Sequence, residues 1–320
     1  MLSTTARAQR VDYLRLSITD RCNLRCTYCM PAEGVPEREH DDILRYEELV
    51  AFTRVAVAAG ISKVRITGGE PLVRKGCASL IAQLAAIPGL DDISLTTNGV
   101  LLPRFAAELR AAGLRRVNIS IDSLDPARYR RITRGGDLAG ALAGIEAAFA
   151  AGFAPVKINA LLLPGIEDEL GSFVDLTRVQ PLHVRFIEYM PLDRRLESHE
   201  QFVSAAEVLA RLRAANVLEP VAGPYGNGPA RYWRVPGGEG TIGFIAGVSD
   251  HFCASCNRLR LTADGRLRSC LFAGDDVNIR PLIARPADLL AALTVAVSDK
   301  NYDRCLEARA NERAMSQIGG

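Results

Sequence analysis

The chain has 320 residues, of which 48% are hydrophobic and 24% are charged, and its formal net charge is +2. These values are ordinary for a globular protein with one large domain, or with one domain and an appendage. The small net charge argues against a general nucleic-acid binder, and no apolar run is long enough to span a membrane.

Strand-like and helix-like segments alternate from residue 11 to about residue 190. The six predicted strands are Val11–Thr19, Ile61–Thr67, Asp92–Thr97, Arg116–Ile121, Pro155–Leu162 and Leu182–Glu188. Gly60, Gly113 and Gly152 stand just past three of the helical segments, where they would end the helices. This alternation predicts parallel βαβ units, and six units are fewer than the eight of a closed barrel. We therefore predict an α/β fold built on an incomplete (βα)6 TIM-type barrel.

Apolar and polar residues alternate within the first five of these strands. In the first strand, Leu14 and Leu16 fall on one face, and Arg15 and Ser17 fall on the other. Strands buried on both faces normally read as continuous apolar runs, so one face of this sheet is predicted to be polar. A polar lumen needs a ligand, because unpaired buried polar groups are costly. A half-exposed sheet with a wet face is the alternative.

Three cysteines, Cys22, Cys26 and Cys29, follow the first predicted strand directly. A disulfide between two of them would leave an odd thiol. Three thiolates in one short loop can instead hold three corners of a 4Fe-4S cluster, leaving one iron open to a ligand from solution. A zinc site is the alternative, although zinc usually takes four ligands in paired spacing, and no His or fourth Cys lies nearby.

The C-x3-C-x2-C spacing, with Tyr28 just before its last cysteine, resembles the signature of the radical S-adenosylmethionine (SAM) enzymes. The resemblance implies that the three cysteines bind a 4Fe-4S cluster and that its open iron holds SAM. An electron from the cluster would then release a 5′-deoxyadenosyl radical. The segment 68–71, Gly-Gly-Glu-Pro, resembles the site for the SAM amino group in that family. By itself this segment could be a plain turn, in which Glu70 braces the loop.

From residue 196 onward the pattern changes, and we predict two domains. Residues 1–195 would form the radical SAM partial barrel, and residues 196–320 an irregular α+β cap with a second cluster site and a Gly-Gly tail. Ser204–Asn216 is predicted to be a helix capped by its first residue. Gly- and Pro-rich turns then separate short strands such as Ala230–Val235 and Thr241–Ile245.

A second set of three cysteines lies in the predicted cap, at Cys253, Cys256 and Cys270. Asp264-Gly265 favours a tight turn, so a hairpin around it would return the third cysteine to the other two. The set could be a structural zinc site with His251 as fourth ligand, or it could hold a second cluster with an open iron.

Paired arginines mark both strands of this predicted hairpin. Arg258 and Arg260 point to one side of the first strand, and Arg266 and Arg268 repeat the spacing on the second. Guanidinium groups near a metal site suit a polyphosphate, because each binds phosphate oxygens with two hydrogen bonds. A solvated charged face is the alternative.

The run from Cys253 to Gly265, with Cys270 after it, resembles the branch of the radical SAM enzymes that cyclises GTP in molybdenum cofactor biosynthesis. The similarity extends from Arg15 nearly to the C-terminus. It implies a lyase that removes the ribose 3′ hydrogen of GTP and forms 3′,8-cyclo-7,8-dihydro-GTP. It also implies a second 4Fe-4S cluster, on Cys253, Cys256 and Cys270, that binds the guanine base.

Carried over by position, this resemblance implies three sets of site residues. The SAM contacts would be Tyr28, Gly69, Ser120 and Met190. The GTP contacts would be Arg15, Arg65, Thr96, Lys157, Arg258, Leu259 and Arg260. The catalytic set would be Cys22, Cys26, Cys29, Arg258 and Arg260.

The resemblance also implies that the terminal Gly319-Gly320 reaches the active site, although a frayed end is the default for such a tail. Cys77 and Cys305 match no ligand position, and we expect both to be structural thiols. With no apolar signal segment in residues 1–10, we expect a cytoplasmic protein whose thiols serve as ligands rather than forming disulfides.

The implied partners are a reducing electron donor, a downstream cyclic pyranopterin monophosphate synthase and a second copy of the chain in a homodimer. Neither nucleic acid nor a membrane is expected. Two alternatives stay open at this point. One is a radical SAM peptide-modifying enzyme with an auxiliary cluster, which would usually carry more C-terminal cysteines. The other is a zinc-binding module without catalysis.

Overall fold

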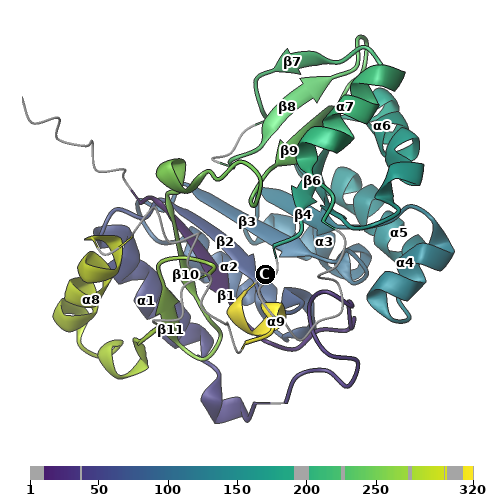
Figure 1. The fold of residues 1–320 in the computed structure, drawn as a ribbon. Coiled ribbons are helices and arrows are strands. Elements are labelled where there is room, and N and C mark those ends of the chain that lie inside the picture. The colour runs from purple at the N-terminus through teal and green to yellow at the C-terminus, as the bar shows by residue number, and fades with distance from the viewer. Residues whose placement is uncertain are drawn as a thin grey trace, which may run out of the picture.

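Six parallel strands form the centre of one twisted sheet (Figure 1). They are β1 (Tyr13–Ser17), β2 (Lys63–Thr67), β3 (Asp92–Thr97), β4 (Arg116–Ser120), β5 (Val156–Leu162) and β6 (Leu182–Glu188). Each pairs in parallel with the next. The predicted strands are therefore confirmed, with ends that differ by at most two residues. The fold is α/β and contains the incomplete (βα)6 TIM-type barrel that the sequence predicts.

The structure is a computed structural model, and it describes residues 11–36, 38–190, 202–224, 228–272, 276–298, 300 and 313–319. The amino-terminal segment, Cys305 and Gly320, to which the sequence analysis refers, lie outside these ranges. Within these ranges, the helices are all too short or too polar to cross a membrane.

The C-terminal part of the chain adds strands to both edges of the same sheet. Beyond β1 lie β10 (Arg258–Leu261), β11 (Arg266–Arg268) and β12 (Val277–Asn278); beyond β6 lie β9 (Thr241–Ile245), β8 (Arg231–Arg234) and β7 (Glu219–Val221). β10 pairs in parallel with β1, and β9 pairs in parallel with β6. The predicted cap is thus continuous with the barrel sheet, while the division at residues 195/196 stays a prediction.

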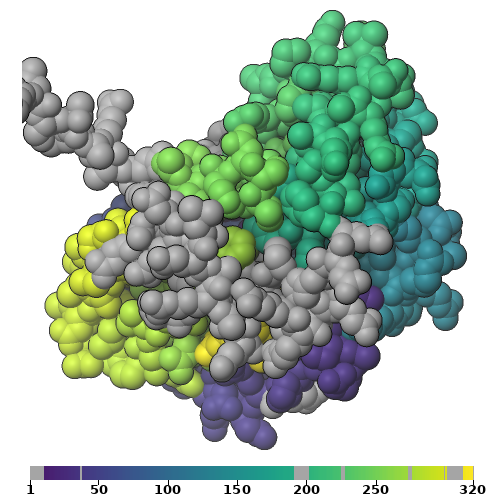
Figure 2. All heavy atoms as spheres, in the orientation of Figure 1, coloured from purple at the N-terminus to yellow at the C-terminus, as the bar shows by residue number. Residues whose placement is uncertain are grey.

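The two ends of the described chain lie together as a result of this pairing. Figure 2 shows yellow-green residues from the C-terminal part beside purple residues from the N-terminal part, whereas the teal and green middle of the chain forms the other side. The linear strand order means that the sheet does not close on itself within the part of the chain that the structure describes.

Helices cover the outer face of the sheet (Figure 1). They are α1 (Tyr46–Ala58), α2 (Cys77–Ala85), α3 (Leu102–Ala111), α4 (Pro126–Thr133), α5 (Leu138–Ala150), α6 (Leu170–Val179), α7 (Ala205–Ala215) and α8 (Pro286–Ser298), whereas α9 (Met315–Ile318) lies on the opposite face. Short 3-10 turns are η1 (His40–Asp42), η2 (Pro71–Val73), η3 (Ile166–Glu169), η5 (Cys253–Ser255) and η6 (Arg280–Leu282). Leu14 and Leu16 of β1 are buried in one core cluster with Phe52 of α1 and Leu80 of α2. Each such side chain contributes about 1.5–3 kcal/mol by leaving water.

Local sequence signals set the helix ends as expected. The Ser204 hydroxyl accepts a hydrogen bond from the Glu207 amide, and the Glu207 carboxylate accepts one from the Ser204 amide, so α7 begins with a capping box. Gly60, Gly113 and Gly152 all have positive φ, which lets the chain leave the helices before them. The predicted helix at 204–216 and the three predicted helix stops are confirmed.

The polar face of the sheet is also buried. Ser17, Ser94 and Asn118 are each at most 1% exposed, although they stand on the face opposite the helix-packed core. The alternative of a half-exposed sheet with a wet face is therefore wrong, and the sheet encloses a polar lumen.

Two glycines of α5, Gly144 and Gly140, form a matched pair that tests how closely this helix packs against Gly99. A Cβ added at Gly144 would overlap the carbonyl oxygen of Gly99, whereas one at Gly140 would meet nothing closer than Val100 Cγ1, at 3.7 Å. We expect Gly144→Ala to lower the free energy of unfolding by about 1–3 kcal/mol. Gly140→Ala should raise it by up to about 1 kcal/mol, because alanine favours helix. Urea unfolding measures both, and equal effects would contradict the close approach of α5 to Gly99.

Candidate active site

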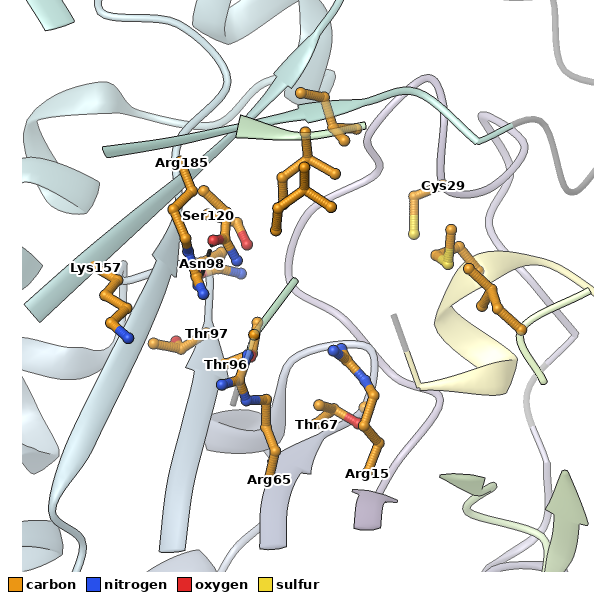
Figure 3. Close-up of a pocket in the computed structure, with 18 of the residues that line it drawn as sticks. Arg15, Cys29, Arg65, Thr67, Thr96, Thr97, Asn98, Ser120, Lys157 and Arg185 are labelled. Carbon is orange, nitrogen blue, oxygen red and sulfur yellow. Dashed lines mark hydrogen bonds between the residues drawn. The ribbon is translucent and has the colours of Figure 1, made fainter. Parts of the chain in front are cut away.

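One cavity of about 270 Å³ lies on the polar face of the sheet, lined by strands β1 to β6, the cysteine loop after β1, β10 and α9. Figure 3 shows Cys29 on one side of this cavity, with Lys157 and Arg185 on the other. The two ends differ in chemistry: thiols line one end and basic side chains line the other. We call them the cysteine end and the cationic end.

Cys22, Cys26 and Cys29 all line the cysteine end. The loop that carries them is held by α4, because the Thr27 amide donates to the Ile132 carbonyl at 2.9 Å. All three are free thiols. Their sulfur atoms therefore share one cavity wall, as the sequence predicts.

Burial raises the pKa of each of these thiols, and the neighbouring sulfurs raise it further at Cys26 and Cys29. Burial and the charge of Cys22 together raise the pKa of Cys29 to about 12. Three thiolates can coexist here only beside a strong positive charge, which iron supplies. The residues thus fit a 4Fe-4S cluster.

The described residues fit a cluster better than they fit zinc. Within them, no three His, Cys, Asp or Glu side chains converge on a single metal ion. A zinc site requires such convergence. The ligands of a four-iron cluster need not converge, because each thiolate binds a different iron.

Glu70 ties the loop after β2 to the loop after β3. Its carboxylate accepts hydrogen bonds from the Leu72 amide (3.1 Å), the Thr97 hydroxyl (2.8 Å) and the Asn98 amide (2.7 Å). Burial raises the pKa of Glu70 to about 7, although these three bonds act in the opposite direction. Glu70 therefore braces the loop, as the sequence analysis suggests.

Asp122 is a buried carboxylate at the cysteine end to which the sequence analysis assigned no role. It accepts a hydrogen bond from the Tyr28 hydroxyl at 2.6 Å and another from the Leu161 amide at 2.8 Å. It lies two residues beyond Ser120, so the alternation of polar and apolar residues along this segment predicts that its side chain faces the lumen. The pair fixes the position of the Tyr28 ring beside the cysteines.

The cationic end concentrates positive charge. Eight Lys or Arg side chains line the cavity, against three Asp or Glu. Strand register sets Arg15 of β1 opposite both Arg65 of β2 and Arg260 of β10. Burial, followed by the charges of Arg260 and Arg65, lowers the pKa of Arg15 well below its usual value. Buried like charges of this kind require an anion.

Lys157 and Arg185 extend the cationic end across β5 and β6. Burial, followed by the charges of Arg185, Arg116 and Arg65, lowers the pKa of Lys157 to about 6. Arg185 Nη2 donates to the side-chain oxygens of Asn118 (2.6 Å) and Asn159 (2.5 Å).

Three basic residues that line the cavity, Lys63, Arg116 and Arg185, are absent from the predicted site. Arg185 stands between apolar Val184 and Phe186 on β6. The alternation of polar and apolar residues was the only sequence signal for Arg185, and this alternation is weaker in the sixth strand than in the others. Arg116 forms a buried ion pair with Asp92, so it adds little to the net charge of the cavity.

Most predicted site residues come together in this cavity. Those that line it are Arg15, Cys22, Cys26, Tyr28, Cys29, Arg65, Gly69, Thr96, Ser120, Lys157, Met190, Arg258 and Arg260. Leu259 does not line it, because its side chain is fully buried in the core and its backbone pairs with Leu14.

The second cysteine set borders the cationic end. The predicted hairpin is present, because β10 and β11 pair antiparallel, and Leu271 beside Cys270 lines the cavity. Burial would raise the pKa of the Cys256 thiol, but the charges of Arg258 and Lys300 lower it to about 7. This positive surrounding suits a thiolate ligand.

Cys253 is disulfide-bonded in this structure, whereas Cys256 and Cys270 are free. The expectation that the thiols form no disulfides is therefore wrong for Cys253. Its sulfur can bind iron only after that bond is reduced. His251, the alternative zinc ligand, has Nδ1 3.0 Å from the Gly247 carbonyl oxygen.

Arg266 and Arg268 do not line the cavity, contrary to the sequence analysis, and Arg268 is not part of a solvated face either. Arg268 is 1% exposed and forms an ion pair with Asp276 at 3.1 Å. Arg266 Nε lies 3.8 Å from Asp264. Arg268 therefore holds the hairpin instead of facing the cavity, and the Arg266 side chain is 39% exposed.

The C-terminal tail enters the cationic end. The Gly319 carbonyl accepts hydrogen bonds from Arg15 and Arg260, both at 3.4 Å. Gly319 has φ +79°, and a Cβ there would lie 2.9 Å from Ser17 Cβ and from Thr67 Oγ1. Only glycine fits this position. A frayed end is thus wrong for the described residues of the tail.

Two family models match the chain: the Radical SAM superfamily over residues 16–176, and Molybdenum Cofactor Synthesis C over residues 182–305. Together with the barrel and the cysteine loop, the first match defines a radical SAM enzyme.

Curated relatives are similar over almost the whole chain. A GTP 3′,8-cyclase of Moorella thermoacetica is 51% identical over 317 residues, and one of Geobacter sulfurreducens is 50% identical over 318 residues; each alignment covers 98% of both chains. The chain belongs to the GTP 3′,8-cyclase family. This membership excludes the alternative of a zinc-binding module without catalysis.

The solved structure of Streptococcus suis SuiB bound to precursor peptide SuiA has a TM-score of 0.66 to this chain. The match covers 92% of this chain and 66% of SuiB, at 14% sequence identity. At that identity the likeness shows the shared fold alone, so it does not favour the alternative of a peptide-modifying enzyme.

Gly69 tests the close contact between the two loops of the cysteine end. A Cβ at Gly69 would overlap the Arg21 carbonyl oxygen, whereas one at Gly171 on α6 would meet no atom within 4 Å. An overlap costing about 1–3 kcal/mol should weaken SAM binding roughly fivefold or more in Gly69→Ala. Gly171→Ala should bind SAM as the parent does. Equilibrium binding to the anaerobically reconstituted chain measures this, and unchanged affinity in Gly69→Ala would contradict the assigned contact.

Proposed function

We propose that the cavity binds SAM at its cysteine end and GTP at its cationic end, and that the protein is a lyase that converts GTP to 3′,8-cyclo-7,8-dihydro-GTP. This is the first step of molybdenum cofactor biosynthesis. One observation carries the proposal: three free thiols and a buried group of arginines share a single cavity. Neither SAM nor GTP alone would account for both ends.

The chain would hold two 4Fe-4S clusters, one on Cys22, Cys26 and Cys29 and the other on the second cysteine set. When bound, the first supplies the electron that cleaves SAM, and the second anchors the guanine base. The remaining contributions come from side chains and backbone of this chain. They are binding, orientation and the exclusion of water.

At the cysteine end, the proposed SAM contacts are Tyr28, Gly69, Ser120 and Met190. All four line the cavity. The absence of a side chain at Gly69 lets a ligand approach the backbone. The hydrogen bond from Tyr28 to Asp122 keeps the ring in place before the ligand arrives, which lowers the ordering cost of binding.

At the cationic end, Arg15, Arg65, Lys157, Arg258 and Arg260 are the proposed contacts of the triphosphate. Guanidinium groups bind phosphate oxygens in pairs of hydrogen bonds, and a triphosphate would offset the repulsion among these charges.

Thr96 is the proposed polar contact of the nucleotide on β3. Its buried Oγ1 finds no hydrogen-bond partner among the described residues. A buried hydroxyl of this kind is costly unless a ligand completes it. The contact carried over to Leu259 rests on the resemblance alone, since its side chain lies in the core.

The enclosed lumen sets the distance between the two ligands and keeps bulk water out. Reacting atoms need to be held about 3–3.5 Å apart, and a radical in a wet site would react elsewhere. The buried polar face and the Gly319 tail both restrict the space beside the nucleotide. The electron donor, the downstream synthase, the homodimer and a cytoplasmic location stay predictions.

The direct test is anaerobic incubation of the reconstituted chain with GTP, SAM and a reductant. We expect 5′-deoxyadenosine and cyclised GTP by mass analysis. Cys26→Ala should abolish both, because two thiolates cannot hold the cluster, whereas Cys77→Ala, which removes a buried thiol outside the cavity, should retain both. Deoxyadenosine formed by Cys26→Ala would refute the ligand role of this cysteine.

The low pKa of Lys157 leads us to expect that GTP binding is accompanied by the uptake of a proton. With a pKa of about 6, it is mostly neutral above neutral pH in the free protein. A triphosphate beside it raises that pKa, so binding takes up a proton and the affinity falls as pH rises above about 6.

Calorimetry at pH 8, in two buffers with different ionisation enthalpies, measures this uptake. We expect it to disappear in Lys157→Met and to persist in Lys75→Met, which alters an exposed lysine. An unchanged uptake in Lys157→Met would assign the proton to another group.

A further inference from the structure

Lys300 lies beside the second cysteine set, and no site described so far uses it. Lys300 is 6% exposed, so its charged side chain is buried. Its ammonium group donates to the Arg258 carbonyl and to the Ser269 carbonyl, the latter at 3.0 Å. The Cys256 side chain is close enough to this ammonium group for each to shift the pKa of the other. An ammonium has three donors, and these two carbonyls use two of them.

The two carbonyls belong to the segments that carry the cysteines. Arg258 follows Cys256 by two residues, and Ser269 directly precedes Cys270. One side chain therefore joins the start of β10 to the segment that follows β11. Since the strand ladder ends before either cysteine, Lys300 ties together the parts of the hairpin that the ladder leaves unpaired.

The charge of Lys300 also needs an anion. Burying an ammonium costs several kcal/mol unless a counter-charge accompanies it. In the described part of the chain, no carboxylate forms an ion pair with Lys300, and the side chains whose charges act on its pKa are Cys256, Arg258 and Cys270. A cysteine thiolate is the one anion in this set. The placement thus suits a cysteine that is ionised, as an iron ligand is.

We propose that Lys300 is a positioning residue for the second cluster, which holds Cys256 and Cys270 at their binding distance and favours the reduced state of the bound cluster through its positive charge. Reduction adds an electron to the cluster. A cation beside a ligand sulfur stabilises that added charge and raises the reduction potential. This inference rests on the proposed assignment of the second cluster to Cys253, Cys256 and Cys270.

Four substitutions in the full chain separate charge from packing. Lys300→Arg keeps the charge and the donors. Lys300→Gln keeps two donors without the charge, and Lys300→Met keeps only the aliphatic stem. Lys75→Met removes an exposed lysine as the matched control. Each is placed in a Cys22→Ala, Cys26→Ala, Cys29→Ala background, so that iron and spectroscopic signals report the second cluster alone.

Iron content per chain and the midpoint potential, followed by electron paramagnetic resonance during anaerobic titration, are the readouts. We expect a more negative potential in Lys300→Gln, a parent-like potential in Lys300→Arg and Lys75→Met, and reduced iron loading in Lys300→Met. A parent-like potential in Lys300→Gln would overturn the inference.

The parent background is measured first, because it separates two kinds of failure. If it holds no cluster, the cysteine assignment fails and the inference falls with it. If it holds four irons and Lys300→Gln leaves the potential unchanged, the assignment stands and only the role of Lys300 is wrong.

Discussion

Buried positive charge at one end of the lumen is the constraint on which the rest of the molecule depends. Strand register places Arg15 between Arg65 and Arg260, so three guanidinium groups stand side by side inside the protein. Such a group costs free energy in the absence of an anion. Hydrogen bonds from Arg15 and Arg260 to the Gly319 carbonyl offset part of this cost. The site is therefore organised for a polyanion before any ligand arrives, and the cysteine end faces the space that this polyanion would occupy.

Continuity of the sheet makes this arrangement possible. Because β10 pairs with β1, the arginines of a C-terminal hairpin come to the same level as an N-terminal arginine. The second cysteine set flanks that hairpin, so it borders the lumen without a separate domain having to dock. Lys300 would complete this edge by joining the two segments that carry Cys256 and Cys270. The barrel supplies one half of the site, and the C-terminal strands supply the other.

Local patterns in the sequence predict the barrel well because they depend on neighbours in the chain. Alternation located the six strands, and the Ser204 cap located α7. The pairing of the C-terminal strands with the barrel sheet was not predicted, because the strands with which they pair, β1 and β6, lie far away in the sequence. Arg268 was misassigned for the same reason: its ion pair with Asp276 depends on the return of the chain beyond the hairpin. Arg185 was missed because the alternation of its strand is weak, and the residue roles carried over by resemblance stay predictions.

The central claim is that chemistry begun at the cysteine end acts on a nucleotide held at the cationic end. The most direct measurement uses GTP that carries deuterium at the ribose 3′ carbon, incubated anaerobically with SAM, a reductant and the reconstituted chain. The account predicts one deuterium in the 5′-deoxyadenosine and none at that carbon in the cyclised product. Deoxyadenosine that contains no deuterium, formed alongside cyclised GTP, would contradict it.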